Sequence, residues 1–166
     1  AGLFNINKRN MQKLQIAGVL NCVGGSVDGI QIAGLMNAVL DSVKGVQIAG
    51  LINDVHSGIE GTQVAGVFNR VKKGFTGTQI SGVAGLISGE VQGAQISGVI
   101  NTALQSVTGA QVAGVINIAG KDMNGAQVGI FNYARRLNGW QVGLINVADT
   151  SAGYSLGILN LVLKGY

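Results

Sequence analysis

Apolar and polar positions recur along this chain with a fixed period. A unit that begins with Gln spans 16 residues, as in 31–46, and the Gln returns at this spacing from Gln15 to Gln127, after which the spacing falls to 14. Positions two, five, nine and thirteen are apolar in almost every copy, position four is Gly, and position seven is Asn in all copies but one. Such a period indicates one supersecondary unit stacked on copies of itself. The sequence therefore predicts a single repeat domain over residues 1–166.

The unit favours strands over helices. Its apolar positions are rich in Val and Ile, which suit a pleated surface. The two Gly of each unit, at positions four and fifteen, would each cost a helix about 1 kcal/mol relative to Ala. We therefore expect an all-β fold, a parallel β-solenoid of about ten coils with a length of about 50 Å.

Within a coil we expect one strand over positions one to seven, a turn, a second short strand and a second turn. Asp28-Gly29 and Lys44-Gly45, at positions fourteen and fifteen, predict the second turn, because Gly tolerates positive φ. Positions two, five, nine and thirteen are expected to fill a narrow core. The shorter 127–132 lacks one residue before its Gly, which predicts a bulge in the longer copies, and the second missing residue comes from the turn after Asn.

Two amide columns support in-register stacking. Stacked coils place identical residues about 4.8 Å apart, so the recurring Gln and Asn are expected to form hydrogen-bonded ladders along the axis. Gly85 stands where the other copies have Asn, and it predicts a local bend in its coil.

Two segments carry a family resemblance. Gln-Ile-Ala-Gly-Leu-Ile-Asn (47–53) and Gln-Val-Gly-Leu-Ile-Asn (141–146) resemble the units of bacterial surface-repeat proteins, built on Gly-x-Gln-Ile-Gly-Leu-x-Asn motifs. The ending, 155–166, is similar to the close of such arrays. The resemblance covers essentially the whole chain and implies a place in the bacterial envelope, without any enzymatic motif. Because the chain begins inside a repeat and shows no signal peptide, we expect it to be a piece of a longer protein.

The composition of the chain limits the classes of partner and of site that it can have. Hydrophobic residues make up 47% of the chain and charged residues only 11%, yet no apolar run approaches the roughly 18 residues of a membrane-spanning helix. The net charge of +4 comes from thinly spread Lys and Arg with few aromatic residues, which disfavours nucleic acid as a partner. Cys22 is the single cysteine, so neither an internal disulfide nor a cysteine-based zinc site is expected.

No constellation of side chains predicts catalysis. His56 is the only histidine and lacks the partners of a metal site or a Ser-His-Asp arrangement. The carboxylates fall into columns with basic residues, so we expect exposed ion pairs, an Asp28–Lys44–Glu60 ladder and an Asp54–Arg70 pair. The prediction is a protein without enzyme activity, catalytic residues, cofactor or metal.

Basic and aromatic side chains offer weaker signals. Arg70, Lys72 and Lys73 form one small basic turn and Arg135 with Arg136 another; these are either solvated edges or contacts for anionic lipid headgroups or polysaccharide. Trp140 and Tyr154 share position sixteen, where they stack on sugars, thicken the shorter coils or cover the last one.

Position six is the strongest candidate for a functional surface. Neighbours in a strand point to opposite faces, so one of positions five and six should lie in the core and the other outside, unless Gly at position four turns both inward. A continuous exposed apolar column would mark an interface. The candidate interface residues are Leu20, Met36, Ile52, Phe68, Ile100, Ile116, Phe131 and Ile145.

The leading functional hypothesis is a non-catalytic structural or binding scaffold of a bacterial cell surface. It would contact a protein partner or an adjacent domain of the same chain through its repeat faces, with surface polysaccharide as a further ligand. The alternative is a carbohydrate-binding or carbohydrate-active solenoid, although cleavage would need acids converging on one face. The last coil, 156–166, is strongly apolar, so we expect its open strand edge to be covered by another chain or by more of the native protein.

Overall fold

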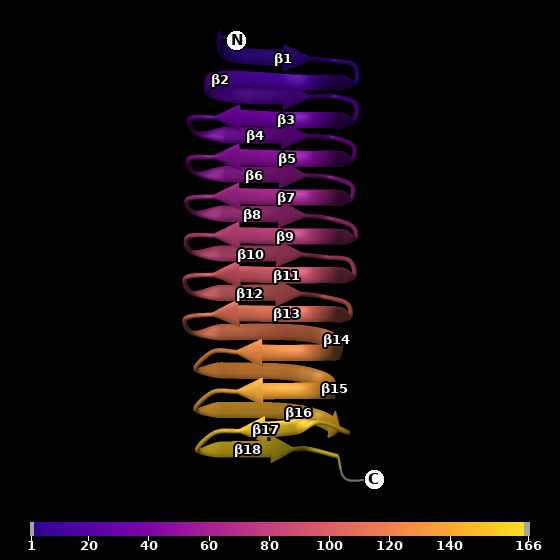
Figure 1. Cartoon of the computed structure of the whole chain (residues 1–166), viewed down its shortest axis with the longest axis vertical. Helices are drawn as coiled ribbons and strands as arrows, with labels where there is room; N and C mark the ends of the chain where they lie inside the picture. The colour runs from indigo at the N-terminus through magenta and orange to yellow at the C-terminus, as the bar shows by residue number, and fades with distance from the viewer. Residues whose placement is uncertain (1, 165–166) are drawn as a thin grey trace.

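The chain winds into a stack of coils (Figure 1). The computed structural model describes residues 2–164, in which every regular element is a β-strand, and all pairings between strands are parallel. The strands are β1 (Gly2–Asn7), β2 (Met11–Val23), β3 (Val27–Ala33), β4 (Met36–Val39), β5 (Val43–Ala49), β6 (Ile52–Val55), β7 (Ile59–Ala65), β8 (Phe68–Val71), β9 (Phe75–Ser81), β10 (Ala84–Ile87), β11 (Val91–Ser97), β12 (Ile100–Ala103), β13 (Val107–Ala113), β14 (Ile116–Val128), β15 (Phe131–Val142), β16 (Ile145–Ser151), β17 (Tyr154–Leu156) and β18 (Leu159–Val162).

Each full coil contributes a long and a short strand, and each strand pairs with its equivalents one coil away. Long strand β5 lies between β3 and β7, so that Gln47 pairs with Gln31 and Gln63. Short strand β6 lies between β4 and β8 in the same register. The predicted parallel β-solenoid of about ten coils, with a 16-residue and later a 14-residue repeat, is therefore confirmed.

The strand boundaries inside the coil differ from the prediction. The long strand runs from position thirteen through position three, positions four and five form a bend, and the short strand covers positions six to nine. The expected strand over positions one to seven and the expected turn at positions fourteen and fifteen are both wrong. Gly45, at position fifteen, does have a positive φ of 127°, but it lies inside β5. A Cβ there would lie 2.1 Å from the carbonyl oxygen of Gly29 in the preceding coil.

The core also has a different composition from the one predicted. Positions nine and thirteen are buried as expected, but positions two and five are not: Ile48 is 40% and Leu51 43% exposed. The remaining core columns are the Gln of position one, the small residue of position three and the Asn of position seven. Because side chains alternate along a strand, the inward Gln and position three force position two outward, while position five lies in the bend.

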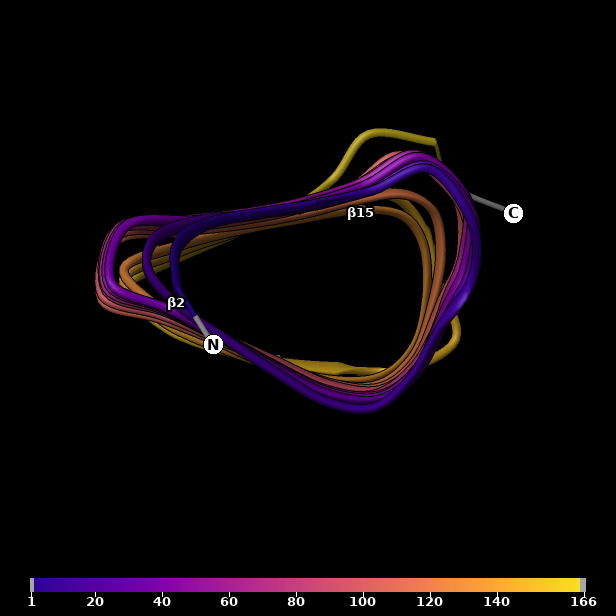
Figure 2. The same cartoon turned by 90° about the horizontal axis from the view of Figure 1, so that it is seen from above.

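Each of the shorter coils lacks one residue in the bend between long and short strands and one residue in the turn on the opposite side. β14 and β15 pair fifteen residues apart at Ile116 and Phe131, and fourteen apart at Asp122 and Arg136. The first lost residue therefore belongs to the bend between long and short strands, rather than to a bulge within one strand, and the second belongs to the turn after the Asn, as predicted. Seen along the axis, the first shortened coils, orange in Figure 2, lie inside the outline of the earlier ones on the turn side, whereas the yellow C-terminal part departs from that outline.

Candidate functional site

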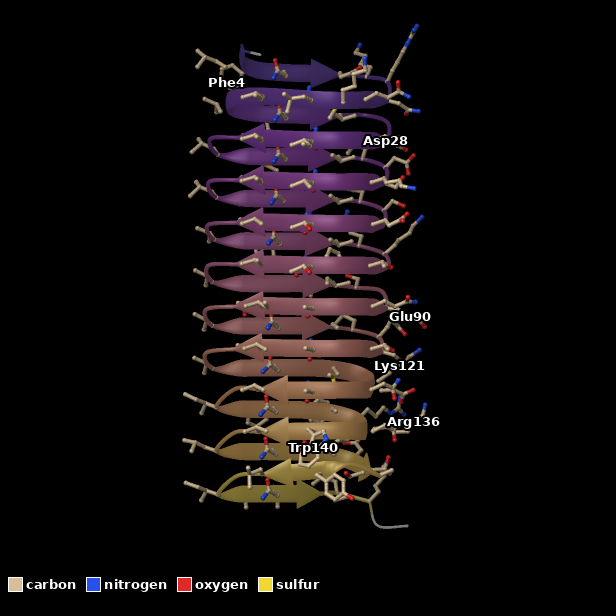
Figure 3. All side chains as sticks on the ribbon, viewed as in Figure 1. Phe4, Asp28, Glu90, Lys121, Arg136 and Trp140 are labelled. Atoms are coloured by element: carbon tan, nitrogen blue, oxygen red, sulfur yellow. The ribbon has the colours of Figure 1, made fainter. Side chains whose placement is uncertain are left out.

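One side of the solenoid carries an uninterrupted apolar strip, the apolar edge. It consists of position five in the bend together with positions two and six on the flanking strands, and none of these positions holds a charged residue. Phe4 marks this side in Figure 3. Exposed members at positions two and five are Leu3, Ile16, Leu35, Ile48, Leu51, Val67, Ile80, Val83, Ile96, Val112, Val115, Val128, Ile130, Val142, Leu144, Leu156 and Ile158.

The candidate interface of position six belongs to this edge. Leu20, Met36, Ile52, Phe68, Ile100, Ile116, Phe131 and Ile145 all lie on the outer face of the short strands and are partly exposed. The expectation that either position five or position six would enter the core is wrong, since neither does. Met36, Ile52 and Phe68 line a small hollow of about 240 Å³, whose wall is the Asp54–Arg70 ion pair.

The amide ladders hold the apolar edge together from within. Asn37 donates through Nδ2 to the carbonyl oxygen of Ile48, at 2.8 Å, and to Oδ1 of Asn53, at 2.9 Å. The short strand is thereby tied across the bend to the long strand of the next coil. Gln47 donates in the opposite direction, from Nε2 to Oε1 of Gln31 at 2.8 Å. Both predicted ladders are confirmed: the Gln side chains are fully buried from Gln31 to Gln141, and the Asn side chains from Asn21 to Asn146, with Gly85 in place of one Asn.

The gap at Gly85 is filled by neighbouring side chains. Asn69 donates to the hydroxyl of Ser81 at 2.9 Å, and Gln95 donates to the carbonyl oxygen of Gly85 at 3.1 Å. Across the gap, Asn101 Oδ1 has no hydrogen-bond partner among residues 2–164, because the Asn that would donate to it is missing. β10 nevertheless pairs with β8 and β12 in unbroken register, so the predicted bend is wrong.

The opposite side, the charged edge, carries the turn at positions ten to twelve and the start of each long strand. Asp28, Glu90, Lys121 and Arg136 project there, on the side opposite Phe4 (Figure 3). Lys44 and Glu60 pair at 3.8 Å, but Asp28 forms no ion pair within the described chain, so only half of the predicted ladder exists.

The predicted Asp54–Arg70 pair is confirmed on the outer face of the short strands. Arg70 Nε donates to Asp54 Oδ1 at 2.8 Å, and this hydrogen bond raises the pKa of Arg70. His56 lies beside the pair, with Nδ1 4.0 Å from Asp54 Oδ2, and its side chain is half-exposed rather than fully solvated.

Within residues 2–164, no group of three or more His, Cys, Asp or Glu side chains is arranged to hold a metal ion. The same residues contain no helix long and apolar enough to cross a membrane.

The shortened coils bring together a group of mainly charged residues, of which only Arg135 and Arg136 were candidates from the sequence. Lys121, Asp122, Arg135, Arg136, Asp149, Thr150 and Lys164 surround a recess of about 440 Å³ on the charged edge. They lie at the same corner of consecutive coils, within β14, β15 and β16 and just after β18, and this recurrence along the repeat would have identified the group. Burial, and then a 3.1 Å hydrogen bond to Asp149, raise the pKa of Tyr133 beside this recess, while the nearby charge of Arg135 lowers it.

The aromatic residues of position sixteen lie outside the core. Trp140 and Tyr154 stack with ring centroids 4.9 Å apart and are 54% and 67% exposed, so they do not fill the smaller coils. In the last coil the apolar residues Leu156, Ile158 and Leu163 are likewise exposed. Comparison of the chain with protein-family models, curated proteins and solved structures found no significant match.

Proposed function

We propose that the chain is a non-catalytic scaffold of a bacterial cell surface that binds a protein partner, or an adjacent domain of the same chain, through its apolar edge. The observation that carries this proposal is that positions two, five and six are exposed or partly exposed along the whole stack. The assignment to a bacterial surface is supported by the resemblance of the repeat units to those of bacterial surface-repeat proteins.

The size of the edge supports an interface. Five residues at about 3.3 Å each and coils at about 4.8 Å each, repeated about ten times, give a strip on the order of 800 Å². A typical specific interface buries about 800 Å² on each partner, whereas apolar patches on monomers seldom exceed about 600 Å². The strip is thus large enough for one standard interface.

The rigidity of the edge points the same way. Its bend is tied by Asn side chains at every full coil except that of Gly85, so its apolar side chains are held at regular spacing before any partner arrives. A surface fixed in its bound geometry loses little conformational entropy on binding, which raises affinity.

The chain itself is the probe for this proposal, because an apolar strip of this size also associates with a second copy. We expect light scattering to show a mass that rises with concentration. The double variant Leu35→Asp/Leu51→Asp should remove the association while preserving the β-type circular dichroism. The matched control is Leu40→Asp/Leu104→Asp, which places the same charges on exposed leucines of the charged edge. A chain that stays monomeric, or an equal loss in the control, would contradict the proposal.

The position-six column can be tested within the same experiment. Ile52→Asp/Ile100→Asp should weaken association as the position-five variant does, because both columns belong to one strip. The alternative, carbohydrate binding, is favoured by the exposed Trp140–Tyr154 stack. Fluorescence of Trp140, the only tryptophan, that responds to a polysaccharide while the chain remains monomeric would support this alternative instead.

A further inference from the structure

The charged edge contains a recess that the proposed scaffold function does not use. Four basic side chains line it: Lys121 from β14, Arg135 and Arg136 from β15, and Lys164 from the segment after β18. The recess measures about 440 Å³, which lies within the range of ligand sites, about 300 to 1,000 Å³.

The change in repeat length creates the recess. The turn loses one residue between the coil of Asp122 and the coil of Arg136, so the shorter turns are set back from the longer ones. Figure 2 shows this step on the turn side, where the orange coils lie inside the outline of the earlier ones. Lys121 belongs to the last long turn and Arg136 to the first short one, and Figure 3 shows both on the same edge.

The two carboxylates of the recess already have partners. Arg136 holds Asp122 through both Nε and Nη2, the latter at 2.9 Å, and Asp149 accepts a hydrogen bond from the Tyr133 hydroxyl. Lys121, Arg135 and Lys164 form no ion pair with any residue in the range 2–164. Four cations facing two engaged carboxylates leave the recess with a surplus of positive charge.

We propose that this recess binds a phosphoryl group, carried either by a soluble phosphorylated molecule or by the headgroup of an anionic lipid. A guanidinium such as that of Arg135 offers two parallel N–H donors that match two phosphoryl oxygens, and ammonium groups such as those of Lys121 and Lys164 add point charges. A ligand with two negative charges matches the surplus better than a single carboxylate does. The site lies on the edge opposite the apolar strip, so it stands or falls independently of the proposed docking function.

Inorganic pyrophosphate is the first probe, titrated into the whole chain by calorimetry. The variant Lys121→Gln/Arg135→Gln/Lys164→Gln removes the three unpaired cations, all of them exposed, and lowers the formal net charge from +4 to +1. We expect its affinity to fall on the order of tenfold or more, because each lost contact is a charge-assisted hydrogen bond.

The matched control, Lys44→Gln/Lys72→Gln/Lys73→Gln, makes the same change of charge on the charged edge of the longer coils. Its affinity for pyrophosphate should stay within about twofold of the unmodified chain, since local contacts and not net charge hold the ligand. Circular dichroism verifies that both variants are folded. Equal losses in the two variants, or no binding by the unmodified chain to either this probe or the vesicles below, would overturn the proposal.

Vesicles distinguish the two sources of the phosphoryl group. Co-sedimentation with phosphatidic acid vesicles, against phosphatidylcholine vesicles, tests a membrane-borne headgroup. Binding to phosphatidic acid that is lost in the recess variant and kept in the control, without binding of pyrophosphate, would assign the site to a lipid surface. Binding of pyrophosphate without sedimentation would assign it to a soluble ligand.

Discussion

At the apolar edge every coil repeats Gly followed by two apolar residues, whereas at the charged edge the three turn residues change from coil to coil. Leu40-Asp41-Ser42, His56-Ser57-Gly58 and Lys72-Lys73-Gly74 occupy the same turn in successive coils. Both edges reverse the direction of the same chain, and both are stacked at the same spacing. The difference therefore cannot come from the repeat length or from the need for a turn.

The backbone geometry explains the difference. A Cβ on Gly50 would lie 2.0 Å from the carbonyl oxygen of Gly34, so no side chain fits at this bend. On the charged edge a Cβ on Gly74 would meet nothing closer than the carbonyl oxygen of Glu90, at 3.7 Å. Successive coils touch backbone to backbone at the apolar edge, and there the sequence is fixed. At the charged edge the space differs from coil to coil: Gly74 has room for a Cβ, whereas a Cβ on Gly89 would lie 2.4 Å from the carbonyl carbon of Lys73. The bend therefore demands Gly in every coil, while the turn accepts different residues, charged ones included.

The strongest test of this comparison exchanges Gly for Ala on the two edges. We expect Gly50→Ala to lower the free energy of unfolding by about 3 kcal/mol or more, because its Cβ must push a stacked backbone apart. Gly74→Ala should change it by less than about 1 kcal/mol, and a small gain is reasonable, since Ala restricts the unfolded chain. Urea denaturation followed by circular dichroism measures both. Similar losses in the two variants would show that the edges are equally tight.

The Asn ladder gives a second test, in which one serine substitution should stabilise a variant and destabilise the unmodified chain. Asn53→Gly removes an acceptor for Asn37 and should cost about 2 kcal/mol, because buried amide groups lose their partners. Adding Ala49→Ser to this variant reproduces the natural pair Ser81 and Gly85, and should recover about 1 kcal/mol.

The same Ala49→Ser change in the unmodified chain is the control. There Asn53 already accepts the hydrogen bond from Asn37, so the added serine hydroxyl would be buried without a hydrogen-bond partner. Among the described residues, Ser97 Oγ is in this situation. We expect this single variant to be destabilised. A serine that has the same effect in both backgrounds would refute the explanation of the Gly85 coil, and the double-mutant cycle measures this coupling directly.

The period, the parallel register and both amide ladders could be predicted from the sequence, because only in-register stacking brings identical residues together. Which apolar columns face the core and which face the solvent could not be predicted. Ile48 at position two and Val55 at position nine are equally apolar, and what separates them is the burial of Gln47, whose polarity alone would suggest the surface. The recess escaped prediction for another reason. Lys121 and Lys164 are distant in sequence, and they fall into one column only when the change of repeat length is followed through the last coils.

The smallest expected effect compares two ion pairs. Arg70 and Asp54 form a two-contact pair on the flank of the apolar edge, where the Asp54 side chain is only 13% exposed. Lys44 and Glu60 meet at 3.8 Å on the charged edge, with side chains 68% and 67% exposed. Exposed pairs contribute about 0 to 1 kcal/mol, and less when the two charges are well solvated. We therefore expect Arg70→Ala to lower the free energy of unfolding by about 1 kcal/mol and Lys44→Ala by no more than about 0.3 kcal/mol.

Raising the salt concentration from low to about 1 M, where the screening length falls to about 3 Å, should erase the Lys44 effect and retain part of the Arg70 effect. If Lys44→Ala lowers the free energy of unfolding more than Arg70→Ala does, the charged edge contributes to the stability of the fold. Its sequence would then vary between coils for a reason other than the absence of a structural constraint.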